Sequence, residues 1–451
     1  MTQGPIRKQL ISFARPLFAG SLIQLLYNTV DLMFVGRVLG TEASAAVGAS
    51  SLIVTCILGA FTGLSVGVGV VTAKAVGSGN IGRLNQIIHC AAGLTCVLSL
   101  VFTVLGLIMA PEFLRWIQTP ADVLENATAY LRLYLLSLIS IVSYNMGSGI
   151  LRALGNTKSP TLYQLAGGIA NIIGNTLFIC FLDWGVQGAA LATACSQGLA
   201  AFLIIRHLCT IKTPYRLRLR QLQINASICG QFLLVGIPAA IQSIVITLSN
   251  LIVQAHINQL GIDSMAAFTA YFKVENFIYL PIMAFGQACS TFTSQNIGAN
   301  QVDRAKQGVK TSLFLGITVT ISASVLTLCF SDFAFGLFSK EPAVIALGTK
   351  IAFVAYPFYF IYVFLEVYAS AIRGAGKALP AMLIVVINMC VVRTCILKVV
   401  LHFYPNALGV AAIYPLTWAC TGLCLFLYYK SGGWFSAQTD VARKRISVGQ
   451  R

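Results

Sequence analysis

Acidic and amide side chains inside long apolar segments are the residues of this chain that could carry chemistry. Gln24, Asn28 and Asp31 are spaced by four and three residues, so they share one face of the helix that we predict for this segment. A carboxylate inside a bilayer-spanning helix costs roughly 3 kcal/mol on insertion scales, which makes Asp31 a functional candidate. The alternative is structural: Asp31 caps a broken helix or pairs with Arg37.

Amide and hydroxyl side chains recur at helical spacing elsewhere in the first half of the chain. They are Asn145, Gln164, Asn171, Asn175 and Thr193. A carboxylate surrounded by such groups suits a proton or a hard cation such as sodium, which prefers oxygen ligands. The alternative is that these amides only bind neighbouring helices to one another.

The second half carries polar faces with a different set of charges. The residues that we predict to line a polar cavity there are Asn250, Gln254, Tyr271, Glu275, Tyr279, Tyr362, Glu366 and Arg393. Glu275 and Glu366 are interpreted either as further protonation sites or as anionic partners for a cationic substrate. The alternative is that the pairs Glu275–Lys273 and Glu366–Arg393 are internal ion pairs that only hold the helices together.

The segments that carry these residues are long and apolar. Hydrophobic residues make up 57% of the chain and charged residues 10%, whereas soluble domains have about 25% charged residues. Runs of about 20 apolar residues are long enough to cross a bilayer as helices. We predict twelve such spans, near 10–36, 48–74, 85–110, 126–151, 160–182, 187–207, 226–258, 265–296, 308–332, 343–372, 378–402 and 407–430. The predicted fold is therefore an all-α membrane protein.

The second half of the sequence repeats the first at a nearly constant offset. Repeated pairs include Pro16 and Pro238, Asn28 and Asn250, and Arg83 and Arg304. In a hydrophobic chain of this length, two homologous halves predict a transporter built from two six-helix bundles. We place the first bundle at 1–207, a basic linker at 208–224, the second bundle at 225–430 and a basic tail at 431–451.

Glycine and proline positions predict how the helices pack and bend. Gly59, Gly63 and Gly67 form a pattern that is typical of helices in close contact. Four prolines within or at the start of predicted spans indicate bends. They are Pro16, Pro238, Pro281 and Pro357.

Lys and Arg residues are distributed unevenly along the chain. The N-terminal tail, the even-numbered loops and the C-terminal tail hold most of them, which predicts that both termini lie in the cytoplasm. The linker 208–224 has no acidic residue, which favours contact with anionic membrane lipids. The basic residues are not interleaved with aromatic residues, which argues against a nucleic-acid partner. The thirteen cysteines are scattered without a paired CxxC motif, so we predict no metal site and no cofactor.

Several motifs resemble those of a known family and occur in the same order. They are YNTVDLMFVGRVLG (27–40), LRALGNTKSP (151–160), GVQGAALAT (185–193), QNIGANQVDRA (295–305) and AIRGAGKALP (371–380). On these motifs the chain resembles the multidrug and toxic-compound extrusion (MATE) family over essentially its whole length. The resemblance implies two six-helix bundles that form a V and export cationic and amphipathic drugs in exchange for protons or sodium.

The resemblance also implies a cation-coupling site in the first bundle. Asp31 matches the first-helix acid of prokaryotic members, and Asn145, Asn171, Asn175 and Thr193 match its polar network. We add Asn28, because it shares a helix face with Asp31. Asn175 stands where many relatives have an aspartate, which leaves Asp31 as the only acid of this network.

The prediction is an antiporter in the inner membrane of a prokaryote, monomeric and not an enzyme. Its expected partners are cationic or amphipathic small molecules and membrane lipids. A flippase for lipids or lipid-linked oligosaccharides, from the same superfamily, is the nearest alternative, although such proteins often have fourteen spans. A channel and a membrane-embedded enzyme are further alternatives. The identity of the substrate and the choice between proton and sodium stay open.

Overall fold

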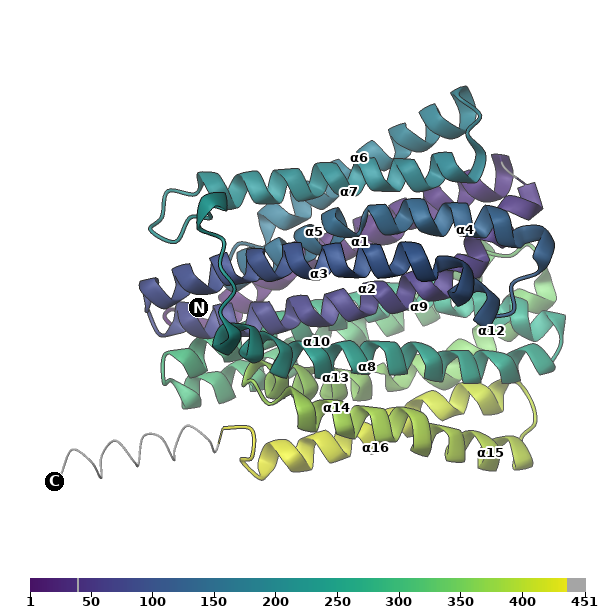
Figure 1. The fold of residues 1–451 in the computed structure, drawn as a ribbon. Helices are drawn as coiled ribbons and strands as arrows, with labels where there is room; N and C mark the ends of the chain where they lie inside the picture. The colour runs from purple at the N-terminus through teal and green to yellow at the C-terminus, as the bar shows by residue number, and fades with distance from the viewer. Residues whose placement is uncertain (39, 436–451) are drawn as a thin grey trace. The chain divides into compact units, whose positions relative to one another are not determined.

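The computed structural model describes residues 1–38 and 40–435, without the side chains of residues 28, 31–33, 35–37 and 40–45 (Figure 1). Helices dominate this part of the chain, and none of it forms a strand. In the first half they are α1 (Ile6–Val38), α2 (Gly40–Gly77), α3 (Ile81–Trp116), α4 (Ala121–Leu136), α5 (Leu138–Ala153), α6 (Lys158–Asn175), η1 (Thr176–Phe181) and α7 (Gly185–Thr210). In the second half they are η2 (Leu219–Gln221), α8 (Ala226–Gln259), α9 (Ile262–Gly298), α10 (Val302–Cys329), α11 (Ser331–Gly336), α12 (Pro342–Ala355), η3 (Tyr356–Phe358), α13 (Tyr359–Gly374), α14 (Ala378–Val386), η4 (Ile387–Val392), α15 (Arg393–Phe403) and α16 (Ala407–Lys430).

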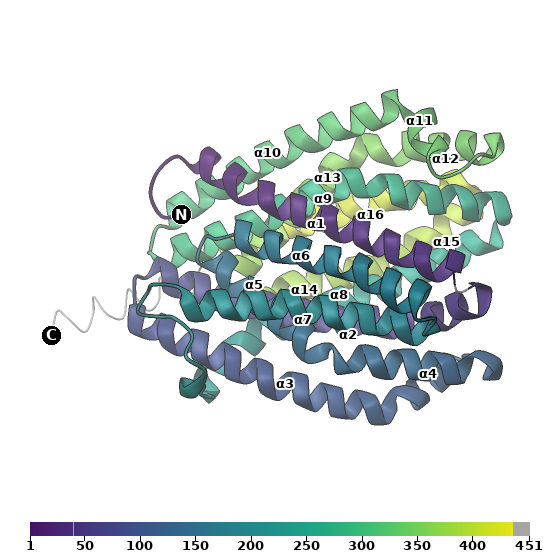
Figure 2. The same ribbon diagram turned by 90° about the horizontal axis from the view of Figure 1, so that it is seen from above.

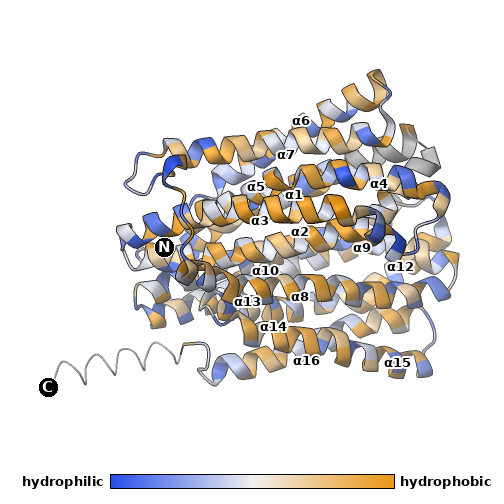
Figure 3. Cartoon of the chain, in the orientation of Figure 1, coloured by the Kyte–Doolittle hydropathy of each residue, from blue (hydrophilic) through white to orange (hydrophobic). Residues whose placement is uncertain are grey.

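These helices confirm the prediction of an all-α membrane protein. Each predicted span corresponds to one helix or one interrupted helix within the described residues. Ten of these are long and apolar enough to cross a bilayer, and the pair α4–α5, bent by 44°, gives an eleventh. The remaining predicted span is α9, whose sequence carries Lys273 and Glu275. Figure 3 shows that apolar residues cover the helices along most of their length.

Some of the breaks within the membrane spans are explained by a proline, and others are not. Pro357 lies in the single 3₁₀ turn η3 between α12 and α13, where its missing N–H breaks the helical ladder. The other three prolines lie inside helices that continue past them. The bend between α4 and α5 occurs at Ser137, without a proline. Two π-helical segments, η1 and η4, follow α6 and α14 directly.

The chain divides into two compact units, and the division runs through two helices. The N-unit comprises Arg15–Ala240, and the C-unit comprises Met1–Ala14 together with the chain from Ile241 onward. This division differs from the predicted bundles 1–207 and 225–430. The reason is that the first turns of α1 pack with helices of the second repeat, whereas the first half of α8 packs with helices of the first repeat.

Within each unit the helices pack in the same pattern. In the N-unit, α2 contacts α3, α4 and α5, and α7 contacts α5 and α6. In the C-unit, α9 contacts α10, α12 and α13, and α16 contacts α13 and α15, as Figure 2 shows for α9, α10 and α13. Each unit has its own buried apolar cluster. The duplication seen in the sequence is therefore a duplication of helix packing.

The basic linker follows the surface of α3 in the N-unit. The backbone N–H of Arg218 donates to Nε2 of His89 over 3.1 Å, and Leu217 is buried. The side chains of Arg216 and Arg220 are exposed. The linker is thus held by its backbone and leaves its charges free for solvent or lipid headgroups.

The predicted glycine face of α2 is confirmed at two of its three positions. A Cβ on Gly63 would lie 2.2 Å from the backbone N of Ala240, and one on Gly67 would lie 2.3 Å from the carbonyl O of Phe232. Both partners are in the first half of α8. Only glycine therefore allows α2 and this half of α8 to approach so closely.

We expect Gly63→Ala to destabilise the protein by about 2 kcal/mol or more, because the added methyl would overlap backbone atoms of α8. The measurement is the yield and thermal stability of the detergent-solubilised protein. Gly230→Ala, in the facing helix α8, is the control, since a Cβ on Gly230 meets no atom within 4 Å. Equal stability of the two variants would contradict the assigned contact.

Candidate functional site

A chain of buried amides and a hydroxyl connects α6 and α7 in the N-unit. The Nδ2 of Asn175 donates to Oδ1 of Asn171 over 3.3 Å, and the Nδ2 of Asn171 donates to Oγ1 of Thr193 over 3.4 Å. Asn171 is 2% exposed and Asn175 is fully buried. The structure therefore brings three of the predicted coupling residues together.

Asn145 behaves differently from the other predicted coupling residues. Its Nδ2 donates to the carbonyl O of Ile141 in its own helix, α5, over 2.8 Å. The backbone carbonyl O of Asn145 accepts a hydrogen bond from Oγ of Ser65 over 2.6 Å. The Asn145 side chain is thus bonded within α5.

The first helix runs parallel to α6 within the N-unit, and the register is defined by successive contacts. Oγ1 of Thr161 donates to the carbonyl O of Pro16 over 2.8 Å, and Nε2 of Gln164 donates to Oε1 of Gln24 over 3.0 Å. One turn later, a Cβ on Gly168 would lie 3.3 Å from the ring of Tyr27.

The next turn of each helix carries Asp31 on α1 and Asn171 on α6. Asp31 therefore lies one helical turn beyond the Tyr27–Gly168 contact, on the helix that packs against α6. The side chains of Asn28 and Asp31 lie outside the described residues.

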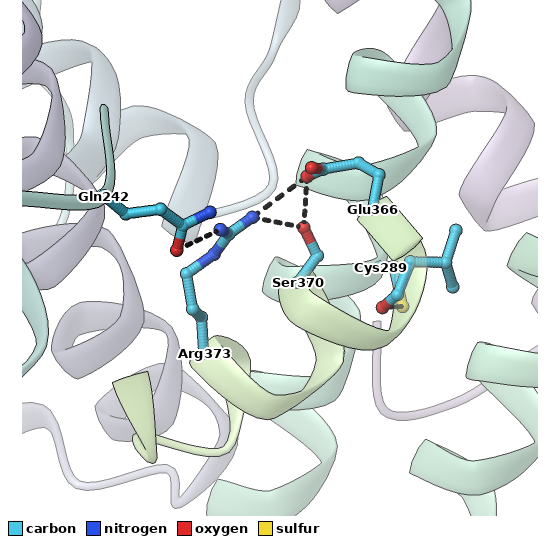
Figure 4. Close-up of polar contacts among 6 residues, drawn as sticks. Gln242, Cys289, Glu366, Ser370 and Arg373 are labelled. Atoms are coloured by element: carbon cyan, nitrogen blue, oxygen red, sulfur yellow. Dashed lines mark hydrogen bonds and ion pairs between the residues drawn. The ribbon is translucent and has the colours of Figure 1, made fainter. Parts of the chain in front are cut away.

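In the C-unit a buried ion pair lies along α13 (Figure 4). Oε1 of Glu366 accepts from Nη2 of Arg373 over 2.9 Å and from Oγ of Ser370 over 2.7 Å. The Nη1 of Arg373 also donates to Oε1 of Gln242 on α8 over 3.3 Å. Glu366 is 4% exposed, so this carboxylate is neutralised inside the bundle.

The alternative in which Glu366 pairs with Arg393 is therefore corrected: the internal ion pair forms with Arg373. Arg373 is two helical turns from Glu366 on the same face of α13, so it reaches the carboxylate without contribution from another span.

The two repeats differ where Glu366 sits. Glu366 occupies the position that Asn145 has in the first repeat, and Gly286 occupies the position of Ser65 at the same offset. A Cβ on Gly286 would lie only 2.6 Å from Oε1 of Glu366. The loss of a side chain on α9 thus provides the space for the carboxylate on α13.

Glu275 lies in an aromatic environment in the same unit. Its Oε1 accepts a hydrogen bond from the phenol of Tyr359. Within the described chain Glu275 has no ion pair, so the predicted pair with Lys273 is not formed. The ammonium of Lys273 instead lies 5.6 Å from the ring centre of Phe338.

The predicted tyrosines line this aromatic cluster. The rings of Tyr271 and Tyr356 are stacked at 5.1 Å, and those of Tyr279 and Tyr362 lie 5.7 Å apart. Tyr359 packs edge-on against Trp418 at 4.6 Å.

The sequence predicts one polar face of span ten that includes Tyr359, Ser370 and Arg373, whereas Gln242 and Trp418 were missed. Tyr359, Ser370 and Arg373 carry a signal, because they share the helical face of Tyr362 and Glu366. Gln242 and Trp418 carry none, because they come from other helices.

Arg393 is a buried base at the start of α15. Its Nη1 donates to Oδ1 of Asn250 over 2.9 Å and to Oγ of Ser249 over 3.4 Å, and its guanidinium lies 5.0 Å from the ring centre of Tyr414. Arg393 and Asn250 occupy the positions that Asn171 and Asn28 have in the first repeat, at one common offset. The second repeat therefore has a cation where the first has a neutral amide.

Gln254, by contrast, is bonded to Asn258 of its own helix, over 2.9 Å. Within the part of the chain that the structure describes, no hydrogen bond joins Gln254 to Arg393.

The two units thus present different chemistry on one frame. The N-unit has neutral amides beside the helix that carries Asp31. The C-unit has a neutralised pair, Glu366–Arg373, together with the carboxylate Glu275 and the base Arg393. No group of three or more potential metal-binding side chains occurs in the part of the chain that the structure describes.

Comparisons with known proteins match most of the chain. The protein-family model MatE matches residues 16–177 and 238–397, which begin at the repeated prolines. The protein named "Probable multidrug resistance protein YpnP" from Bacillus subtilis is 28% identical over 96% of this chain and 97% of its own length. The FAD transporter of Shewanella oneidensis is 25% identical over 86% of each chain.

Solved structures share the fold. A multidrug resistance MATE family transporter in an outward-facing conformation superposes with a TM-score of 0.91 at 21% identity, covering 97% of this chain and 98% of that one. A MOP superfamily transporter from Pyrococcus furiosus gives 0.88 at 21% identity, covering 95% and 96% of the two chains.

Proposed function

This chain belongs to the MatE family, and on that premise we propose that it exports cationic or amphipathic compounds in exchange for protons, by alternating access across a prokaryotic inner membrane. Bacterial relatives named as multidrug resistance proteins support the cargo class. The distribution of Lys and Arg supports cytoplasmic termini.

The observation that carries the proton coupling is the register between α1 and α6. Asp31 follows the Tyr27–Gly168 contact by one turn of α1, and Asn171, whose buried amide is bonded to Asn175 and Thr193, follows it by one turn of α6, which supports a carboxylate near these amides. A single carboxylate among neutral hydrogen-bonding groups binds one proton and changes its charge when it does so. That change of charge in a low-dielectric site alters the free energy of α1 packing against α6.

Sodium is the second coupling ion that these groups could bind. Amide and hydroxyl oxygens are suitable ligands for a hard cation. The neutral Asn175 leaves one carboxylate in the network, which supports the proton over a sodium site that needs more negative ligands.

The test is efflux from liposomes that contain the purified protein. Ethidium is the probe, and a pH gradient is imposed with and without sodium. We expect ethidium movement that depends on the pH gradient and is accompanied by counter-movement of protons. Ethidium movement that requires sodium when the pH is equal on both sides would show that sodium, not the proton, is the coupling ion.

Glu275 is the acid that we propose as a contact for the cationic part of the substrate. Glu366 is already neutralised by Arg373. Glu275 instead accepts a hydrogen bond from the phenol of Tyr359 and lies among aromatic rings. Aromatic faces and a carboxylate together attract organic cations.

We expect Glu275→Gln to raise the half-saturating ethidium concentration about tenfold, which corresponds to about 1.4 kcal/mol. Glu341→Gln, at an exposed acid before α12, is the control and should leave the concentration unchanged. An unchanged half-saturating concentration in Glu275→Gln would remove Glu275 from the substrate site.

An anionic cargo is the second candidate, and Arg393 is the observation that favours it. This base is buried and has no ion pair among the described residues, and one relative is named an FAD transporter. The same liposomes, loaded with FAD or with a fluorescent anionic lipid, distinguish the two. Gradient-driven movement of either anion without movement of ethidium would favour a nucleotide exporter or a flippase.

A further inference from the structure

Two arginines that begin the third helix of each repeat make the same contact in both units. In the N-unit, Nη2 of Arg83 on α3 donates to Oε1 of Gln231 on α8 over 2.9 Å. In the C-unit, Nη2 of Arg304 on α10 donates to Oε1 of Gln9 on α1 over 3.3 Å. Gln231 is the repeat equivalent of Gln9, and Arg304 is the repeat equivalent of Arg83. The two contacts are therefore copies of one another.

Each contact joins elements of different repeats. Arg83 belongs to the first repeat, whereas Gln231 belongs to the first helix of the second repeat. Arg304 belongs to the second repeat, whereas Gln9 belongs to the first helix of the first. Each pair nevertheless lies within a single unit, Arg83–Gln231 in the N-unit and Arg304–Gln9 in the C-unit, because the units exchange the N-terminal ends of α1 and α8.

We propose that Arg83–Gln231 and Arg304–Gln9 are two copies of one anchor, which fastens the N-terminal end of α8 and of α1 to the unit built from the other repeat and so positions the helices that carry Asn250 and Asp31.

Each arginine makes a further contact. The side chain of Asn80 accepts a hydrogen bond from the backbone N–H of Arg83 over 2.9 Å, which caps α3 at this residue. The guanidinium of Arg304 lies 5.5 Å from the ring centre of Phe292 on α9 and also donates to the carbonyl O of Gly4 over 2.7 Å. The guanidinium of Arg304 is held by these contacts and loses little freedom when it binds Gln9, whereas the cap fixes only the backbone of Arg83.

The anchored ends are also packed against the unit that holds them. Leu10 and Phe13 of α1 and Phe232 and Val235 of α8 are all buried. The close contacts of Gly63 and Gly67 with this part of α8 leave no room for sliding. Both anchored ends are thus buried in the unit that holds them, and the end of α8 is also closely packed against α2.

The helices leave these anchored ends close to the repeated prolines. The chain passes between the units at Ala14–Arg15 in α1 and at Ala240–Ile241 in α8, and Pro16 and Pro238 lie within one helical turn of these points. Proline removes a backbone hydrogen bond and eases bending there. Each of these helices therefore has an anchored N-terminal end followed by a point where it bends easily, and in α1 the segment beyond that point carries Asp31.

The first test measures hydrogen–deuterium exchange and needs no cargo, so it is independent of the proposed function. We expect Arg83→Gln to raise amide exchange in residues 226–240 and to leave residues 6–14 unchanged. Arg304→Gln should do the reverse. Arg115→Gln, which breaks an exposed pair with Glu112, is the control and should change neither segment. Equal changes in both segments, or none in either, would overturn the proposal.

The second test is a transposed pair, which also guards against a variant that fails to fold. Arg83→Gln and Gln231→Arg are expected each to lower the maximal ethidium efflux rate about fivefold, in line with the loss of one charged hydrogen bond, with an unchanged half-saturating concentration. The double variant carries the same two side chains in exchanged positions and should recover most of the rate. A double variant no faster than the single variants, or a raised half-saturating concentration, would show that these residues do not act as an anchor.

Discussion

Replacement of Asp31 by asparagine is expected to abolish proton-driven accumulation of substrate while leaving the folded protein intact. Each unit of pH difference supplies about 1.4 kcal/mol per proton, a factor of about ten in concentration. Exchange of one proton for one monovalent cation across two pH units therefore sustains a gradient of about 100-fold in the wild type. The asparagine side chain has no proton to exchange, so the gradient in the variant should fall to about one.

The measurement is the steady-state ethidium gradient in liposomes at a fixed pH difference, with folding checked by gel filtration and thermal unfolding. Asp183→Asn is the matched control. Asp183 is exposed and has a φ of 52°, a conformation that asparagine tolerates well. Liposomes with the Asp183→Asn variant should accumulate ethidium as those with the wild type do. A wild-type gradient in Asp31→Asn would show that another group carries the proton.

The second large effect is on stability and concerns the buried pair of the C-unit. We expect Glu366→Gln to destabilise the protein by about 3 kcal/mol, because it leaves the Arg373 guanidinium without a counter-charge at a site where both side chains are largely buried. The double variant Glu366→Gln/Arg373→Gln should recover most of this loss, because neither charge then remains. The measurement is the thermal midpoint of the detergent-solubilised protein and its double-mutant cycle.

Glu112→Gln provides the comparison at an exposed ion pair. The side chains of Arg115 and Glu112 are 60% and 45% exposed, although their closest approach is only 2.6 Å. Exposed pairs contribute about 0–1 kcal/mol, so this variant should melt close to the wild type. If Glu366→Gln has the same thermal midpoint as Glu112→Gln, the buried pair does not stabilise the protein. Glu366 would then again be a candidate protonation site.

The spans were predictable because each depends on about 20 consecutive residues. Hydrophobic length sets where a helix can cross the bilayer, so the ranges 226–258 and 407–430 agree closely with α8 and α16. Local chemistry also predicts the break at Pro357. It does not predict the bend at Ser137, where no residue type forbids a straight helix.

Partners of the polar residues were predictable only along a single helix. Glu366, Ser370 and Arg373 lie on one face of α13, so their contact follows from spacing alone. Tyr359 reaches Glu275 from α13 to α9, and Asn250 reaches Arg393 from α8 to α15. Such contacts depend on how one helix is rotated about its axis and shifted along it relative to its neighbour. Membrane helices are apolar on most of their surface, so their sequences do not specify this rotation or shift.

The sequence by itself determined the duplication, the set of membrane helices and the position of the acid Asp31 in only one of the two repeats. These properties depend on the order and polarity of residues within a segment. Only the tertiary structure decided that Glu366 has room to be buried beside Gly286, that Glu275 lies among tyrosines, and that the units exchange the ends of α1 and α8. The physical reason is that these outcomes depend on close packing between helices, such as the room that Gly286 leaves for a carboxylate and the contact of Gly63 with Ala240.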